Sequence, residues 1–218
     1  MLTGSINWQL AIETIIVLLV AIDVHELAHA VVADALGDST PRRLGELSLN
    51  PFVHMDQVGV VLLLVTSISG LGFTYGRTHV TPNNLRFGPQ RGGALVAIAG
   101  PVSNIVLAVI CGVVLSHTWT GLPFDYESTA NQLLWVGLEL NILLFILNLI
   151  PIPPLDGFTV LGGFLSARQM YSLAPLQQWG PIVILLLFVA DPQIHILSNI
   201  IDPPLNSIFS TLCSTCVQ

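Results

Sequence analysis

Long apolar stretches alternate along this chain with shorter segments rich in polar residues, glycine and proline. Four stretches approach the roughly 20 residues that a helix needs to cross a bilayer. In chain order they are 12–36, 93–115, 133–150 and about 182–201. A fifth stretch, 58–73, is shorter and is interrupted by serines and glycines. The pattern therefore predicts an all-α polytopic membrane protein.

The basic residues predict how these spans are oriented. All six are arginines, and cytoplasmic loops carry an excess of such residues. If 58–73 crossed the bilayer, Arg42 and Arg43 would lie on the opposite side from Arg77. If 58–73 is a re-entrant segment instead, these arginines share the cytoplasmic side. We therefore expect about four full spans and one re-entrant segment, with both termini outside.

Composition agrees with a membrane-embedded chain. Of the 218 residues, 53% are hydrophobic and 9% are charged, against about 25% charged in an ordinary soluble domain. We expect a single domain over 1–218, with a core over 12–165 and a C-terminal span and tail over 166–218. Cys213 and Cys216 are expected in a frayed tail. The chain has no basic patch of the kind that binds nucleic acid.

The candidate chemistry lies in the second half of the first span, at His25-Glu26-Leu27-Ala28-His29. Histidines four apart project from one face of a helix, where both can bind one tetrahedral Zn²⁺. Glu26 lies beside them and can deprotonate a metal-bound water. Alone, the motif also fits two structural histidines in a helical core. Ionisable side chains are costly inside lipid, however, and therefore indicate a functional site.

A catalytic zinc needs a third protein ligand, and Asp156 is the best candidate. It follows Pro151, Pro153 and Pro154 after the third span, and prolines end a regular helix. A new helix can begin near Leu155. On the predicted topology this presents Asp156 at the cytoplasmic depth of the two histidines. Asp156 could also simply cap the new helix, but the shared depth favours a ligand.

These motifs resemble those of the site-2 proteases, a family of intramembrane zinc metalloproteases. The resemblance covers roughly 12–165 and rests on residues 25–29, 99–104 and 148–157, in the family's order. The Asn50-Pro51 region is similar to that of compact bacterial members, which lack a PDZ domain. The resemblance implies a site-2 protease-like core in which His25, His29 and Asp156 bind zinc and Glu26 is the catalytic base. It also implies that Asn104 helps to position substrate or to stabilise the oxyanion.

Further polar residues are candidates for groups that surround the ligands. They are His54, Asp56 and Asn148. His54 and Asp56 follow the first span in a polar segment, where they could also simply be solvated. Glu46 and the segment 74–78 depart from the pattern expected of close relatives, which leaves substrate handling open.

The resemblance implies cleavage of peptide bonds in or near the transmembrane helices of single-span membrane proteins. It implies a location in the cell (inner or plasma) membrane, with the active site toward the cytoplasm. A metal-ion carrier could use the same three ligands, but it predicts a dispensable Glu26 and internal repeats, which the sequence lacks. A catalytically inactive adaptor that binds membrane helices is a second alternative, although every motif position is intact.

Overall fold

The computed structural model describes residues 7–55, 57–69, 74, 76–123 and 127–217. Within these residues all regular structure is helical and no strand is present, which confirms the all-α prediction. The helices are α1 (Trp8–Ala35), α2 (Thr40–Leu44), α3 (Pro51–His54), α4 (Gln57–Ser69), η1 (Pro82–Asn84), α5 (Gly88–Thr118), α6 (Thr129–Asn148), α7 (Asp156–Gly162), α8 (Ala167–Ser172), α9 (Ala174–Ile194), α10 (Ile196–Leu212) and η3 (Ser214–Val217).

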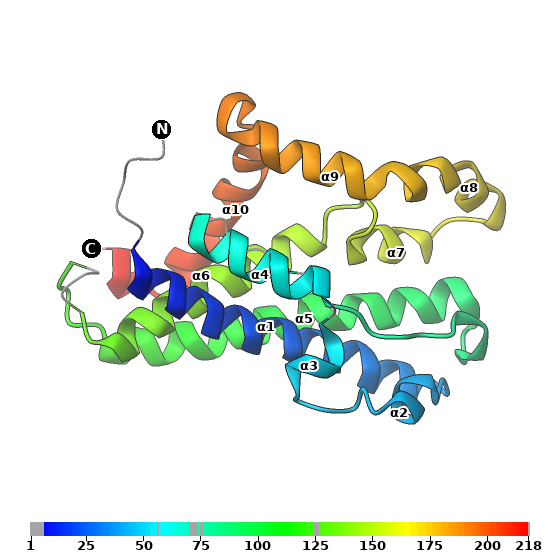
Figure 1. The fold of residues 1–218 in the computed structure, drawn as a ribbon, viewed down its shortest axis with the longest axis horizontal. Coiled ribbons are helices and arrows are strands. Elements are labelled where there is room, and N and C mark those ends of the chain that lie inside the picture. The colour runs from blue at the N-terminus through cyan, green and yellow to red at the C-terminus, as the bar shows by residue number, and fades with distance from the viewer. Residues whose placement is uncertain (1–6, 56, 70–73, 75, 124–126, 218) are drawn as a thin grey trace.

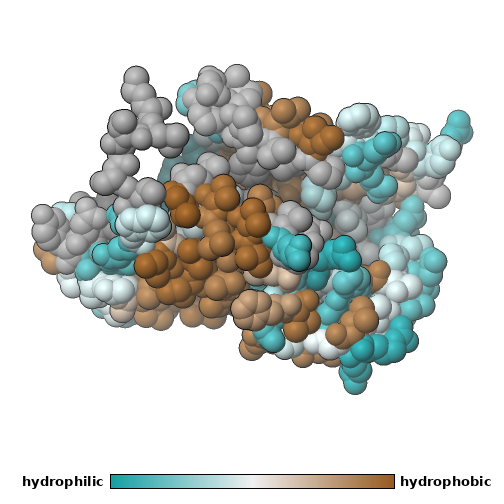
Figure 2. Space-filling model, viewed as in Figure 1, coloured by the Kyte–Doolittle hydropathy of each residue, from teal (hydrophilic) through white to brown (hydrophobic). Residues whose placement is uncertain are grey.

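Three of these helices, α1, α5 and α6, are long and apolar enough to cross a membrane. They lie side by side, with α5 running in the opposite direction to the other two (Figure 1). Each contains most of one predicted span, with ends that differ by a few residues. Figure 2 shows apolar side chains over α1 and α4 and polar side chains near α2. The prediction of a polytopic membrane protein is confirmed.

The predicted fourth span, about 182–201, is wrong as a single helix. α9 ends at Ile194 and α10 begins at Ile196. His195 between them has a left-handed backbone with φ of 53°. Asp191 then accepts hydrogen bonds from the backbone N–H groups of Leu197 and Ser198, at 2.5 and 3.1 Å. Hydropathy did not locate this break, because apolar residues predominate both before Asp191 and after His195.

The stretch predicted to be re-entrant contains α4, which packs along α1 (Figure 1). A 13-residue helix is about 20 Å long, shorter than the roughly 30 Å hydrocarbon core of a bilayer. The backbone N–H of Arg77 donates to the carbonyl of His54 at 2.9 Å, so the chain returns to the level at which it left. Residues 70–73 lie outside the described part. The geometry of the two ends supports a re-entrant segment.

The C-terminal residues are packed, which corrects the expectation of a frayed tail. Cys213 is fully buried against Leu115, Leu138 and Phe209. It forms a disulfide with Cys216. This contact fastens the end of α10 to α5 and α6.

The buried carboxylate of Asp38, just after α1, forms hydrogen bonds with residues 81–84, which precede α5. Asp38 is fully buried and accepts from the backbone N–H of Thr81 at 2.6 Å and the amide of Asn84 at 3.1 Å. The Thr40 backbone N–H and hydroxyl also donate to it, at 3.1 and 2.6 Å. Burial raises the pKa of the Asp38 carboxyl, but these hydrogen bonds outweigh burial and hold that pKa below its ordinary value.

We expect Asp38→Asn to lower the free energy of unfolding by about 1.5–3 kcal/mol at pH 7, because hydrogen bonds to a charged acceptor are lost. Folding lowers this pKa, so the carboxylate stabilises the fold above about pH 3.9. That stabilisation is lost as the pH falls through the lowered pKa. Unfolding in detergent, followed by circular dichroism, should show the difference from the wild type shrinking from pH 7 toward pH 3.

The control is Asp34→Asn, which removes an ion pair with Arg42, whose side chain is 67% exposed. Its effect should be much smaller, because solvent screens exposed ion pairs. A difference between wild type and Asp38→Asn that does not change with pH would contradict this account of Asp38.

Candidate active site

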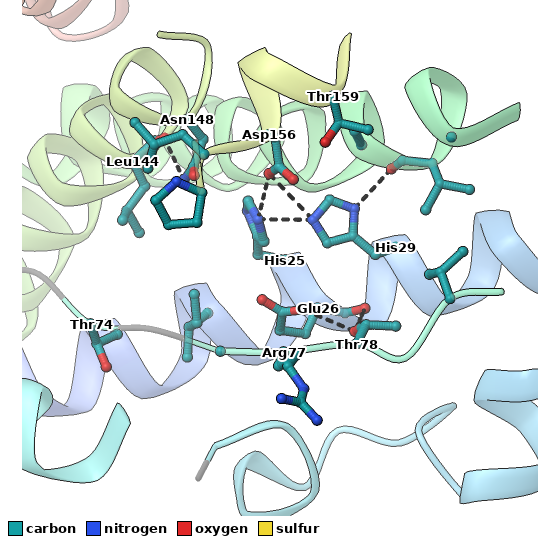
Figure 3. Close-up of a pocket in the computed structure, with 18 of the residues that line it drawn as sticks. His25, Glu26, His29, Thr74, Arg77, Thr78, Leu144, Asn148, Asp156 and Thr159 are labelled. Atoms are coloured by element: carbon teal, nitrogen blue, oxygen red, sulfur yellow. Dashed lines mark hydrogen bonds and ion pairs between the residues drawn. The ribbon is translucent and has the colours of Figure 1, made fainter. Parts of the chain in front are cut away.

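The histidines of α1 and the first residue of α7 meet beside α5 (Figure 3). The Nε2 atoms of His25 and His29 are 3.0 Å apart. Asp156 Oδ2 lies 3.0 Å from His25 Nε2 and 3.3 Å from His29 Nε2. The structure therefore brings together the three residues predicted as metal ligands, from helices far apart in the sequence.

The spacing of these three atoms fits a zinc ion. Two ligand atoms bound to a tetrahedral Zn²⁺ at about 2.0–2.1 Å lie about 3.3 Å from each other. The Nδ1 atoms of His25 and His29 both face oxygen acceptors, which leaves lone pairs on their Nε2 atoms. The buried Asp156 Oδ2 has no hydrogen-bond donor among the described residues. Three lone pairs thus converge on one point, an arrangement that a cation stabilises.

Helix α5 fixes the orientation of both histidine rings. His25 Nδ1 donates to Asn104 Oδ1 at 2.6 Å, and His29 Nδ1 donates to the backbone carbonyl of Val96 at 2.8 Å. Histidines that bind metals are commonly oriented in this way by an acceptor at the other ring nitrogen. α5 comes this close because Gly100 has no side chain. A Cβ at Gly100 would lie 2.4 Å from His25 Nε2 and 2.5 Å from His29 Nε2.

Glu26 lies beside the ligands on α1 and is only 6% exposed. The single hydrogen of the Thr78 hydroxyl is shared between Glu26 Oε2, at 2.8 Å, and the Glu26 backbone carbonyl, at 3.0 Å. A Cβ at Gly76 would lie 2.8 Å from Glu26 Cγ, so the same segment approaches Glu26 as closely as a glycine allows. Sequence reasoning missed Gly76 and Thr78, because no local pattern marks residues that cover a distant helix.

A cavity of about 320 Å³ opens onto the ligands and Glu26. Its walls are largely apolar and come from several helices. Asn148, which was predicted to lie around the ligands, lines this cavity. One N–H of its side-chain amide donates to the backbone carbonyl of Leu144 at 3.0 Å. The cavity is large enough for a short peptide segment beside the metal ligands.

Asn104 lies near the site, as the resemblance implied, in contact with His25. It is fully buried behind His25 and is not among the residues that line the cavity. Its Oδ1 accepts from His25, and its Nδ2 donates to Asn141 Oδ1 at 3.0 Å. Both ends of this amide are bonded within the core, and in this geometry Asn104 orients His25. Its role toward a substrate stays a prediction.

His54 lies on a different side of α1 from the ligands. It is close to Asp23, and Asp23 and His25 project about 200° apart on a helix. The His54 Nε2 atom lies 3.1 Å from the carbonyl of Ser48 and 3.8 Å from Asp23 Oδ1. The side chain is fully buried, so it is not solvated, and it does not line the cavity. Asp56 lies outside the described residues.

Comparison with known proteins gives relatives that cover most of the chain. A Bacillus subtilis protein named "Putative zinc metalloprotease YwhC" is 36% identical over 200 residues, which are 89% of this chain and 88% of the relative. Two proteins named "Putative zinc metalloprotease Rip2" are 31% identical in Mycolicibacterium smegmatis and 32% identical in Mycobacterium tuberculosis H37Rv. These matches cover 78% and 79% of this chain and 64% of each relative. No family model and no solved structure matches the chain.

Gly100→Ala is expected to lower zinc affinity by about tenfold or more, because its methyl group would displace both histidine rings; loss of ligand orientation typically costs 10–100-fold. Zinc retained after dialysis against a chelator measures the effect. The matched control is Gly93→Ala on the same helix, where a Cβ would lie 3.8 Å from the nearest side chain, that of Thr159. Equal zinc retention in the two variants would contradict the close approach of α5 to the ligands.

Proposed function

Because the chain belongs to the site-2 protease family of zinc metalloproteases, we propose that it hydrolyses peptide bonds in or near the transmembrane helices of single-span membrane proteins. One observation carries the proposal. Two histidines on a helix long and apolar enough to cross a membrane converge with the aspartate that begins α7, at the distances of a zinc site. Glu26 and an apolar-walled cavity lie beside them.

The chemistry follows from the positions of these side chains. His25, His29 and Asp156 would hold Zn²⁺, which when bound would supply Lewis-acid activation of a water molecule and of a peptide carbonyl. Glu26 accepts the proton of the attacking water and later delivers it to the leaving amine. The Thr78 hydroxyl, at 2.8 Å from Glu26 Oε2, holds that carboxylate in one orientation. The apolar cavity walls limit competing water and strengthen each electrostatic contact.

Asn148 is a second candidate for the role that the resemblance implied for Asn104. Its side-chain amide lines the cavity near Asp156, and one of its two N–H groups is used by the carbonyl of Leu144. The second N–H is available to the carbonyl oxygen of the scissile bond, where negative charge develops. Removing one such donor from a protease costs about 10²–10³ in kcat.

The segment 76–81 supports a way of holding an unwound substrate. Every second backbone N–H in it is bonded to another segment of the protein. The three pairs are Arg77 with the His54 carbonyl, His79 with Glu46 Oε2 and Thr81 with Asp38 Oδ2. Successive groups of an extended chain point to opposite sides, so those of Gly76, Thr78 and Val80 point toward the cavity that these residues line. An extended peptide can pair with such an edge.

The arginines support a location of the site toward the cytoplasmic side of the cell membrane. Arg42 and Arg43 lie in α2, Arg91 in the first turn of α5 and Arg168 in α8. These elements lie at the same end of the bundle (Figure 1), and all four side chains are exposed. Cytoplasmic loops carry such an excess of basic residues.

The proposal is tested with purified wild-type protein and Glu26→Gln on a panel of tagged single-span substrates. We expect both proteins to bind zinc and only the wild type to cleave, since loss of a general base costs about 10²–10⁴ in rate. Equal cleavage by the two proteins would remove Glu26 from the mechanism. Zinc binding without cleavage of any substrate would favour a carrier or an inactive adaptor.

Substitution of the two asparagines should separate their roles. Asn148→Leu is expected to lower kcat by about 10²–10³ with zinc affinity unchanged. Asn104→Leu is expected to lower zinc affinity, because His25 loses its acceptor. Zinc competition and cleavage kinetics on the same preparations measure the two effects. An Asn104→Leu protein that binds zinc normally yet loses kcat would favour direct contact of Asn104 with substrate.

A further inference from the structure

We propose that Asn141 is a positioning residue that fixes which ring nitrogen of His25 binds zinc, acting through Asn104. The inference rests on the proposed zinc site and adds a residue of α6 that contacts neither zinc nor substrate. Asn141 lies within the predicted third span, and no motif singled it out.

The observation is a buried chain of hydrogen bonds that crosses three helices. His25 Nδ1 donates to Asn104 Oδ1 at 2.6 Å, Asn104 Nδ2 to Asn141 Oδ1 at 3.0 Å, and Asn141 Nδ2 to the backbone carbonyl of Gly137 at 2.8 Å. His25, Asn104 and Asn141 are 3%, 0% and 3% exposed. Water therefore does not compete for these groups.

The donor–acceptor direction of this series of hydrogen bonds is set at Gly137, its last acceptor. A backbone carbonyl can only accept, so Gly137 draws the amide nitrogen of Asn141 and turns its oxygen toward Asn104. Asn104 then presents its nitrogen to Asn141 and its oxygen to His25. An oxygen acceptor requires a hydrogen on His25 Nδ1. A neutral imidazole carries only one such hydrogen, so Nε2 keeps the lone pair that binds zinc.

His29 shows why His25 needs this help. His29 Nδ1 faces the carbonyl of Val96 directly, and that carbonyl fixes the tautomer alone. His25 faces a side-chain amide, which can turn over and offer its NH₂ group instead. That reversal would place the hydrogen on Nε2 and remove the ligand. Among the described residues, the only other contact of Asn104 Nδ2 is a longer one, of 3.4 Å, with the carbonyl of Ala21.

The same bonds could serve only to join α6 to α5, as polar side chains often do between membrane helices. A positioning role and a purely structural role can be distinguished by the substitution that restores zinc binding. A carboxylate at position 104 can accept from His25 Nδ1 but cannot donate to it. Asn104→Asp should therefore fix the His25 tautomer without any help from Asn141, whereas it would not restore a lost contact between helices.

The experiment measures zinc affinity by competition with a chromophoric chelator, and the His25 tautomer by ¹⁵N NMR of the zinc-free protein. The proteins are wild type, Asn141→Leu, Asn104→Asp and the double variant. We expect Asn141→Leu to lower affinity about tenfold, as loss of a group that orients a ligand does, and to populate the Nε2–H tautomer. The double variant should match Asn104→Asp in affinity.

Asn131→Leu is the matched control, since it is the same substitution in the same helix at 4% exposure. Asn131 bonds with Thr118 and Glu127, so its loss should leave zinc affinity unchanged. Normal zinc affinity in Asn141→Leu, or failure of Asn104→Asp to restore it, overturns the role of Asn141 alone. A wild-type protein that binds no zinc overturns the proposed metal site and this inference with it.

Discussion

The contact of α5 with α1 at Gly100 is the constraint on which the site depends. Because Gly100 has no side chain, the Asn104 amide reaches Nδ1 of His25 and the Val96 carbonyl reaches Nδ1 of His29. The rings are thereby held with their other nitrogens toward Asp156. A metal site in this place thus requires, besides its three ligands, Gly100 and two hydrogen-bond acceptors on α5, the Val96 carbonyl and Asn104 Oδ1.

The cost of polar groups in an apolar bundle explains how the surrounding residues are arranged. Buried polar groups are expensive unless they are paired, and the spanning helices are apolar over most of their length. Thr78 pairs with Glu26, and Asn104 and Asn141 pair with each other. The lone pairs of His25 Nε2, His29 Nε2 and Asp156 Oδ2 at the centre of the site remain available to a cation. Asp156 Oδ2 is one of the buried polar atoms without a hydrogen-bond partner among the described residues, and it lies beside the cavity in which a carbonyl can be placed.

The sequence was sufficient for features that depend on local periodicity. The four-residue spacing of His25 and His29 fixes their shared face, and the prolines before Asp156 fix the start of α7. Features that depend on how helices rotate against each other were not predictable. The direction of Asn104, the burial of His54 and the cover of Glu26 by Thr78 belong to this group. The turn at His195 was missed because hydropathy does not report backbone conformation.

We propose that His25, His29 and Asp156 together hold zinc inside the helical bundle. The decisive experiment is zinc X-ray absorption spectroscopy of the purified protein, compared with Asp156→Ala. We expect nitrogen and oxygen ligands at about 2.0–2.1 Å, including two imidazoles, and loss of one oxygen ligand or of the metal in the variant. Sulfur ligands, or a spectrum unchanged by Asp156→Ala, would contradict it.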